Sequence, residues 1–159
     1  MSTVAPADVR KRLLDAWTDE VQAAIVYELI AQRESDPRRA DVLRKLAAVE
    51  VGHRTRLEQR MRELGIEIPN KRSVGISTWR RLQARLAPVD RLLAQQEAME
   101  QAIASEIEER PTGDDGTDRL LDEIKEEEQQ HTTALASLRA GSVPRLAQQS
   151  SPEAPAVRR

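Results

Sequence analysis

Only two histidines occur in the chain, and each lies three residues after a glutamate. The pairs are Glu50 with His53 and Glu128 with His131. Residues three apart on a helix are neighbours on its surface, so each pair presents a carboxylate oxygen beside an imidazole nitrogen. Helical bundles ligate metal ions through this Glu-x-x-His spacing. The two pairs therefore predict a metal centre that is built twice from the same chemistry.

Both pairs lie in apolar stripes at helical spacing, and glutamates interrupt two further stripes in the same way. Glu20 lies in the first stripe, and Glu97 with Glu100 lies in the third. Such a stripe normally faces the core of a bundle. In chain order the stripes are Leu13, Trp17, Glu20, Ala24, Tyr27 and Ala31; Leu43, Leu46, Glu50, His53, Leu57 and Leu64; Leu86, Leu93, Glu97, Glu100, Ala104 and Ile107; and Leu121, Ile124, Glu128, His131, Leu135 and Leu138. Each expected apolar face is thus acidic at its middle.

The acidic residues also lie at one height along the expected bundle. Glu20 and Glu50 are 16 and 14 residues from the first expected turn, and Glu97 and Glu128 are 16 and 15 residues from the second. Because each residue advances a helix by ~1.5 Å, hairpin partners equally far from a turn meet. Positions 20 and 97 differ by 77, and positions 50 and 128 differ by 78. The two halves therefore bring their carboxylates to one layer.

A layer of buried carboxylates needs positive charge, because two carboxylates ~4 Å apart repel by ~4 kcal/mol at an effective dielectric constant near 20. Two divalent ions supply that charge. Oxygen and imidazole ligands without sulfur favour Fe(II), with Mn(II) or Zn(II) as substitutes. Glu100 lies one turn after Glu97 and can reach the same ion as a movable seventh ligand. The alternative is that these glutamates are solvated charges on an exposed helix face.

Stop and cap signals divide the chain into helices and turns. We expect helices at about residues 8–33, 37–64, 79–86, 88–109 and 117–138. Short turns make two helical hairpins, and a long crossover with a short extra helix joins them. The predicted fold is all-α, an antiparallel four-helix bundle over residues 1–141. Residues 142–159 lack periodicity, and we expect a disordered tail.

Composition excludes several classes of protein. A net charge of −2 and a pI near 5.8 argue against a nucleic-acid partner. The chain contains no cysteine, which excludes disulfides, thiolate nucleophiles and iron–sulfur clusters. No apolar stretch approaches the ~20 residues of a membrane span, and the start of the sequence has no secretory signal. We therefore expect a cytoplasmic protein, and limited apolar burial per chain favours a homodimer.

The ligand pattern resembles that of the ferritin-like diiron superfamily, and within it the rubrerythrin type. The segment YELIAQRESDPRRADVLRKLAAVEVGHRTRLEQRMRELGI is particularly similar to the erythrin domain that some bacteria fuse to a membrane iron transporter of the vacuolar type. The resemblance covers residues 8 to 140 or thereabouts. It implies two iron ions held by Glu20, Glu50, His53, Glu97, Glu100, Glu128 and His131. Within that set, it implies a redox-mobile role for Glu100, and outside the set it implies that Tyr27 bonds to a ligand carboxylate.

The chain departs from the family pattern in ways that narrow the function. Ala104 stands where a second tyrosine is expected, seven residues after Glu97. A cysteine-ligated rubredoxin domain is missing, so peroxide reduction would need an external electron donor. Val51 replaces the methionine that binds haem in similar bacterioferritins, so we expect no haem. Without membrane helices, we expect no transport by this chain alone.

We expect a ferroxidase that binds Fe(II), oxidises it with O2 or hydrogen peroxide, and serves iron storage or detoxification, with Glu100 and Tyr27 as the catalytic residues. One alternative is a peroxidase or hydroxylase that uses an external electron donor. Another is a non-enzymatic iron-binding module. Trp17 is interpreted as core packing rather than an electron-transfer site. Trp79 either anchors the crossover or marks a partner surface. The cations near it, Lys71, Arg72, Arg80 and Arg81, are interpreted as a solvated face. The tail either is inert or docks to a shell protein.

Overall fold

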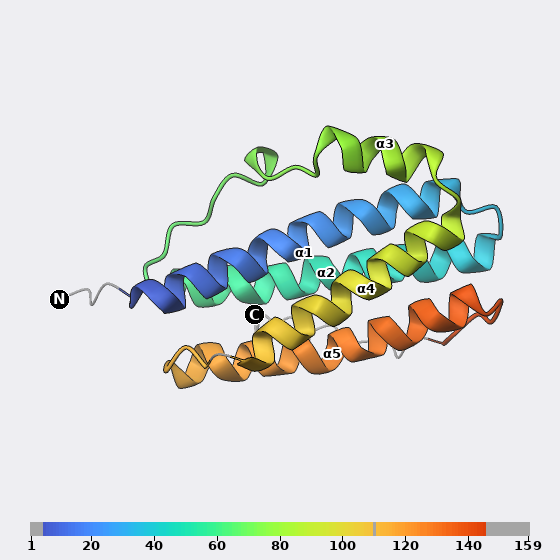
Figure 1. Ribbon diagram of the computed structural model, residues 1–159. Helices are drawn as coiled ribbons and strands as arrows, with labels where there is room; N and C mark the ends of the chain where they lie inside the picture. The colour runs from blue at the N-terminus through green and yellow to red at the C-terminus, as the bar shows by residue number, and fades with distance from the viewer. Residues whose placement is uncertain (1–4, 110, 146–159) are drawn as a thin grey trace, which may run out of the picture.

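The computed structural model describes residues 5–109 and 111–145, apart from the side chains of residues 106–109. Every regular element within them is helical. The elements are α1 (Ala7–Arg33), α2 (Pro37–Glu63), the 3-10 turn η1 (Lys71–Ser73), α3 (Thr78–Leu86), α4 (Val89–Glu109) and α5 (Asp115–Arg139). The hairpin of α1 and α2 packs beside the hairpin of α4 and α5 (Figure 1). The prediction of an all-α, ferritin-like four-helix bundle is confirmed.

Local capping explains why α1 ends and α2 begins within a three-residue turn. The side chain of Asp36 accepts a hydrogen bond from the N–H of Arg38 at 2.9 Å. Pro37 occupies the first position of α2, where its missing N–H costs nothing. The N–H of Asp36 itself donates to Oε1 of Glu34 at 3.0 Å. Side chains close in the sequence thus accept hydrogen bonds from the backbone N–H groups of the turn. The position of the turn could therefore be predicted from the sequence.

The end of α2 is set by Gly65, which has a positive φ of 67°. Its N–H donates to the carbonyl of Arg62 at 3.1 Å, and the N–H of Ile66 donates to the carbonyl of Met61 at 2.8 Å. This is the hydrogen-bond pattern of a Schellman cap. Because the Ile66 side chain is buried against the core, the chain leaves α2 in a defined direction toward the crossover.

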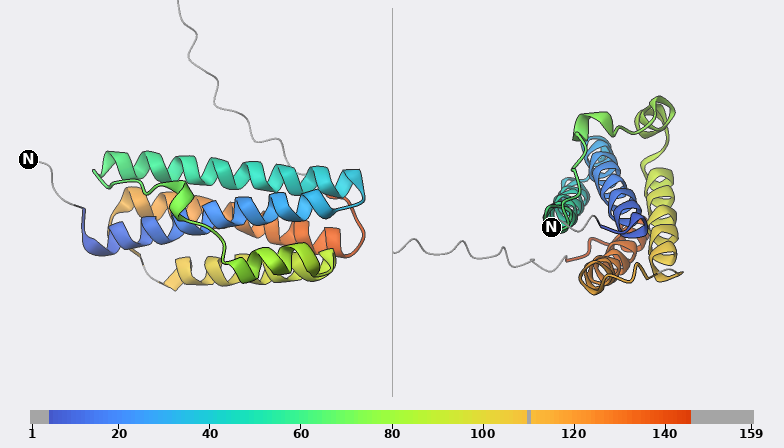
Figure 2. Two further views of the ribbon diagram at one scale, coloured as in Figure 1. Left: turned by 90° about the horizontal axis from the view of Figure 1, so that it is seen from above. Right: turned by 90° about the vertical axis from the view of Figure 1, so that its left-hand side faces the viewer.

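Arg33, the last residue of α1, fastens the crossover helix α3 to the bundle. Its Nη1 donates to the carbonyl oxygens of Ala84 and Ala87, both at 2.7 Å. A helix C-terminus leaves carbonyl groups without hydrogen-bond partners and favours a nearby positive charge. Arg33 supplies both the donor and the charge at the end of α3. The end-on view in Figure 2 shows α3 on the outside of the bundle, beyond α1 and α4.

Several predicted stripe residues lie outside the core, namely Leu86 and the partly buried Ala24, Leu64, Glu97 and Ala104, and the side chain of Ile107 is outside the described residues. Leu86 belongs to α3 and is 72% exposed, although it was placed in the core stripe of the third bundle helix. Pro88 separates α3 from α4, so Leu86 follows the direction of α3 instead of that of α4. Ala24 is only partly buried, because the apolar face of α1 is centred on the neighbouring positions Ala23 and Tyr27.

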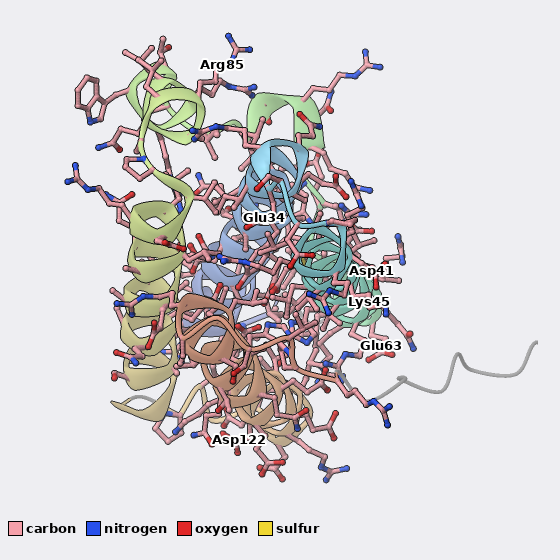
Figure 3. The ribbon with its side chains drawn as sticks, turned by 90° about the vertical axis from the view of Figure 1, so that its right-hand side faces the viewer. Glu34, Asp41, Lys45, Glu63, Arg85 and Asp122 are labelled. Atoms are coloured by element: carbon pink, nitrogen blue, oxygen red, sulfur yellow. The ribbon has the colours of Figure 1, made fainter. Side chains whose placement is uncertain are left out.

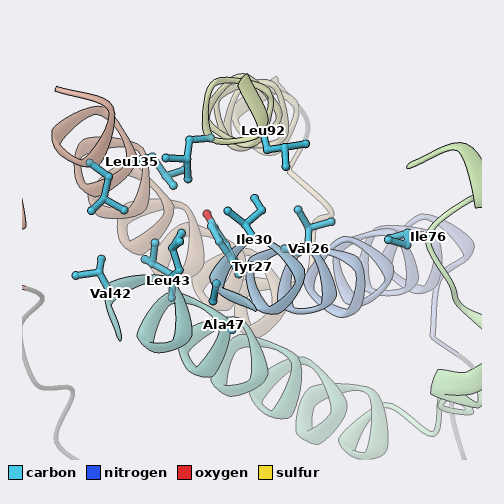
Figure 4. Packing of buried hydrophobic residues seen from close by; sticks show 14 residues of the cluster. Val26, Tyr27, Ile30, Val42, Leu43, Ala47, Ile76, Leu92 and Leu135 are labelled. Atoms are coloured by element: carbon cyan, nitrogen blue, oxygen red, sulfur yellow. The ribbon is translucent and has the colours of Figure 1, made fainter. Parts of the chain in front are cut away.

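Two apolar clusters pack the bundle, one on each side of its middle. The first contains Tyr27, Ile30, Leu43, Leu46, Leu93, Leu135 and Leu138, together with smaller residues (Figure 4). The second contains Val9, Leu13, Trp17, Leu57, Met61, Leu121 and Ile124. All four long helices contribute to the clusters. The acidic and histidine residues of the stripes lie between them.

The predicted helix bounds differ from the observed ones by at most two residues. Within the described part of the chain, no helix is both long enough and apolar enough to cross a membrane. The expected disordered tail begins at residue 142, and residues 146–159 lie outside the described part, so that expectation stays a prediction.

Asp114 caps α5 and joins it to α2, which makes it a test of the fold. Its carboxylate accepts from the N–H of Thr117 at 2.9 Å and pairs with Nη2 of Arg60 at 2.6 Å. These contacts lower the pKa of Asp114 to about 2. We predict that Asp114→Ala lowers the free energy of unfolding at pH 7 by about 1 kcal/mol, the usual cost of a lost cap.

The pH dependence of this loss has a defined sign. Because the folded pKa of Asp114 lies below its ordinary value of 3.8, the stabilisation is complete above that value and fades as pH falls toward 2. Thermal unfolding followed by circular dichroism should therefore separate wild type from Asp114→Ala at pH 7 and bring them together near pH 2. The exposed neighbour Asp115, changed to Ala, is the control. An equal difference at both pH values would contradict this account.

Candidate metal centre

Six polar side chains meet at the middle of the bundle in one layer between the two apolar clusters. We call this group the polar layer. It contains Glu20 from α1, Glu50 and His53 from α2, Glu100 from α4, and Glu128 and His131 from α5. None is more than 7% exposed. This burial excludes the alternative that these glutamates are solvated charges on exposed helix faces.

The two Glu-x-x-His pairs face each other in a crossed arrangement. Nδ1 of His53 lies 3.3 Å from Oε2 of Glu50 and 2.9 Å from Oε1 of Glu128. Nδ1 of His131 lies 3.3 Å from Oε2 of Glu128 and 2.9 Å from Oε1 of Glu50. The two imidazole rings are stacked, with centroids 5.6 Å apart. Each central carboxylate thus directs one oxygen toward each imidazole, as a carboxylate that bridges two metal ions must.

Glu20 completes the first half of the polar layer. Its Oε2 lies 3.5 Å from Nδ1 of His53. Ligand atoms of Glu20, Glu50, His53 and Glu128 all lie within 4.8 Å of one another. One metal ion can therefore contact ligands from three helices.

Unsatisfied polar atoms in the polar layer test whether a metal pair fits. Both carboxylate oxygens of Glu50 and Glu128, and Nδ1 of His53 and His131, are buried without a hydrogen-bond partner of acceptable geometry. The two Nδ1 atoms lie 2.9 to 3.3 Å from these carboxylate oxygens, without the geometry of hydrogen bonds. Buried charges in proteins are paired or coordinate metals. The residues present therefore fit two divalent ions.

Burial and neighbouring charges shift the pKa values of the side chains in the polar layer. Burial raises the pKa of Glu100 to about 11, with the nearby Glu128 carboxylate acting in the same direction. Burial also raises the pKa of Glu20 well above its ordinary range, although His53 opposes this. Burial alone would lower the pKa of His131, but Glu128 and Glu50 raise it to about 9.

The remaining members complete the charge balance. Burial would lower the pKa of His53, but the surrounding carboxylates of Glu128, Glu20 and Glu50 raise it well above its ordinary value. Burial would raise the pKa of Glu50 and Glu128, but close contacts with the two imidazoles, and for Glu128 first with Glu100, lower both. Carboxylate and imidazole groups therefore lie side by side in the polar layer, and their attraction offsets part of the cost of burying them.

Helix α4 presents Glu100 to the polar layer and directs Glu97 elsewhere. Oε1 of Glu100 accepts hydrogen bonds from the Tyr27 hydroxyl at 3.2 Å and from Nε2 of Gln96 at 2.5 Å. Glu97 instead forms an ion pair with Nη1 of Arg139 at 2.7 Å, partly exposed to solvent. The two glutamates lie about 60° apart around the helix. The structure thus brings six of the seven predicted ligands together and leaves Glu97 at the edge.

Tyr27, predicted to bond to a ligand carboxylate, lies beside the carboxyl group of Glu100. Burial and the Glu100 carboxylate raise the pKa of Tyr27, so its hydroxyl remains a donor. Trp17 is fully buried, and its Nε1 donates to Oε1 of Glu58 at 3.1 Å. This satisfies the one polar atom of the indole, in keeping with the interpretation of Trp17 as core packing.

Sequence reasoning missed three residues around the polar layer. Nε2 of His53 bonds to Oε2 of Glu127 at 2.8 Å, and Oε1 of Glu127 accepts from Arg56 at 2.9 Å. This chain of contacts fixes the orientation of the His53 ring, as partners of metal-ligating histidines usually do. Glu127 lies in a run of three glutamates that reads as a surface patch. The third missed residue, Gln96, is signalled only by its four-residue spacing from Glu100.

Comparison with known proteins gives one family match. The family model described as Rubrerythrin matches residues 11–139, a range that includes every residue of the polar layer. The chain belongs to the rubrerythrin family. No curated protein and no solved structure matches it significantly. Membership in the rubrerythrin family and the buried carboxylate–histidine cluster together indicate a diiron-binding protein with the potential for redox chemistry.

Metal binding to this rubrerythrin-family bundle should stabilise it measurably. We predict that Mn(II) at about 100 times its dissociation constant raises the free energy of unfolding by about 2.7 kcal/mol per site, because metal binds only the folded chain. The double variant Glu50→Ala, His53→Ala should lose this gain in thermal unfolding. Glu126→Ala, an exposed position on α5, is the matched control. A gain that persists in the double variant would remove these residues from the site.

The positions of Glu97 and Glu100 lead to opposite expectations for their variants. Glu100→Gln should weaken Co(II) binding by at least about tenfold, because even residues behind a ligand have effects of that size. Glu97→Gln should change the affinity by less than about threefold, because a partly exposed ion pair contributes little. Titration of each variant by Co(II) absorption measures both. Loss of one metal equivalent in Glu97→Gln would show that Glu97 is a ligand and leaves Arg139 when metal binds.

Proposed function

We propose that the protein is a ferroxidase that binds two Fe(II) ions as substrate and oxidises them with O2 or hydrogen peroxide. The crossed arrangement of Glu50 and Glu128, each with one oxygen directed to each imidazole, carries this proposal. Two bridging carboxylates suit a pair of ions better than a single ion. The ligands would be Glu20, Glu50, His53, Glu100, Glu128 and His131, with Glu97 as a seventh only if it leaves Arg139.

The iron pair, when bound, supplies two electrons, which reduce hydrogen peroxide to water or O2 to hydrogen peroxide with the uptake of two protons. The residues of the chain bind the ions and control protons. Tyr27 and Gln96 hold Glu100 on the inner side of α4. Burial raises the pKa values of Glu20 and Glu100, so these two carboxyl groups would release protons when they bind the ions. The apolar clusters on both sides keep bulk water away.

A second candidate is a peroxidase that turns over with an external electron donor. The observation in its favour is a pocket of about 440 Å³ between α3 and α4. Gln96, whose amide donates to Glu100, is part of its lining together with apolar residues such as Val26 and Leu92. A small oxidant in this pocket would lie one side chain away from the polar layer. A cytoplasmic location and a homodimer stay predictions.

The proposal is tested by loading the protein with Fe(II) under anaerobic conditions and then adding O2 or hydrogen peroxide. We expect two Fe(II) to be oxidised per chain, faster than in buffer, and the Glu50→Ala, His53→Ala variant to match buffer. The Glu126→Ala control should behave as wild type. Sustained peroxide turnover only with an external reductant would favour the peroxidase. Tight iron binding without accelerated oxidation would instead identify a non-enzymatic iron-binding module.

A further inference from the structure

The crossover between the two hairpins has a charge opposite to that of the rest of the chain. Residues 68–89 contain five cations and no acidic residue. The cations are Lys71, Arg72, Arg80, Arg81 and Arg85. Because the whole chain has a net charge of −2, the residues outside this stretch carry a net charge of −7. The crossover is therefore a basic segment on an acidic protein.

Helix α3, within this segment, turns its apolar stripe away from the bundle. The stripe consists of Trp79, Leu82 and Leu86, which are 66%, 45% and 72% exposed, although Trp79 also borders the pocket between α3 and α4. Ala84, on the opposite side of the helix, is buried against the bundle. An amphipathic helix normally buries its apolar stripe in the core. The reversed orientation marks α3 as a surface that contacts something else.

The orientation of α3 is fixed by the bundle. Arg33 binds the carbonyls of Ala84 and Ala87, and the Ser77 side chain caps the first turn. Figure 1 shows α3 lying outside α1, and Figure 3 shows Arg85 projecting from it into solvent. The apolar stripe is thus presented by a structured, anchored helix.

A second copy of the chain fits this surface poorly. A two-fold contact through α3 would place two basic segments against each other, because such an interface pairs a patch with itself. A stable interface also needs about 800 Å² per partner. A helix of nine residues is only about 14 Å long. Both the charge and the size of the surface therefore argue for a different occupant.

We propose that α3 and the basic crossover dock the protein on an anionic lipid surface. Helices that lie in a membrane interface place tryptophan and leucine in the acyl boundary and lysine or arginine at the level of the headgroups. Arg81 and Arg85 lie one helical turn apart on one flank of the apolar stripe, where headgroup phosphates would be. Arg72 extends the basic surface along the crossover, whereas Nζ of Lys71 lies 3.7 Å from Oε1 of Glu58. This docking is independent of the metal chemistry.

The test uses the full chain and two kinds of vesicle. One contains equal parts of phosphatidylcholine and phosphatidylglycerol, and the other contains phosphatidylcholine alone. We expect co-sedimentation with the anionic vesicles only, weakened by salt because headgroup attraction is screened. Tryptophan fluorescence should shift to the blue on binding. Because Trp17 is already buried and Trp79 is exposed, the shift reports on α3.

Variants make the outcome decisive. Arg81→Gln, Arg85→Gln should lower vesicle affinity by roughly 25-fold, about fivefold for each cation removed. Arg44→Gln, Arg119→Gln removes two exposed cations on α2 and α5 and is the matched control. The Trp79→Ala variant should co-sediment more weakly with the anionic vesicles, with circular dichroism confirming that it folds.

Three results would overturn the proposal. The first is no binding to either vesicle, and the second is equal binding to both. The third is equal weakening by the control pair, which would show that binding follows net charge and not α3. If size-exclusion chromatography shows an oligomer that Trp79→Ala dissociates, and vesicle binding is absent, the occupant is a second copy.

Discussion

The burial of four carboxylates and two imidazoles in one layer is the constraint on which the rest of the structure depends. Two charges ~4 Å apart interact by ~4 kcal/mol even at an effective dielectric constant near 20, so the layer must be neutralised from within. The contacts of the two imidazoles with the carboxylates do this in part, and two divalent ions would do so more fully. The apolar clusters at both ends are needed because the middle contributes little apolar burial.

Much of this could be predicted from the sequence because the signals are local. The caps at Asp36 and Gly65 use residues within one turn of each helix end, so helix bounds follow from short segments. The pairs Glu50 with His53 and Glu128 with His131 are likewise fixed by their spacing on one helix. Their convergence followed from counting residues to the turns. None of these features requires knowledge of how helices rotate against each other.

The remainder depends on rotation and direction, which packing between helices decides. Glu97 and Glu100 are both compatible with one acidic face, and only the contacts of α4 with Tyr27 and Arg139 select between them. Leu86 has the sequence spacing of a core residue of α4. The chain changes direction at Pro88, so Leu86 belongs to α3 and is exposed instead. Glu127 could not be singled out, since its role comes from His53 on another helix.

The shortest contacts of the two imidazoles run between the two hairpins rather than within them. His53 meets Glu128, His131 meets Glu50, and Tyr27 reaches Glu100 on α4. Neither hairpin can therefore satisfy its own half of the layer, however similar the halves are in sequence. The halves are also unequal. The Tyr27 hydroxyl on α1 donates a hydrogen bond to Glu100 on α4, whereas Ala104 on α4 has no polar side-chain group to donate to a carboxylate on α1. Two metal ions bound here would experience different surroundings, so a difference in their affinities follows from the fold itself.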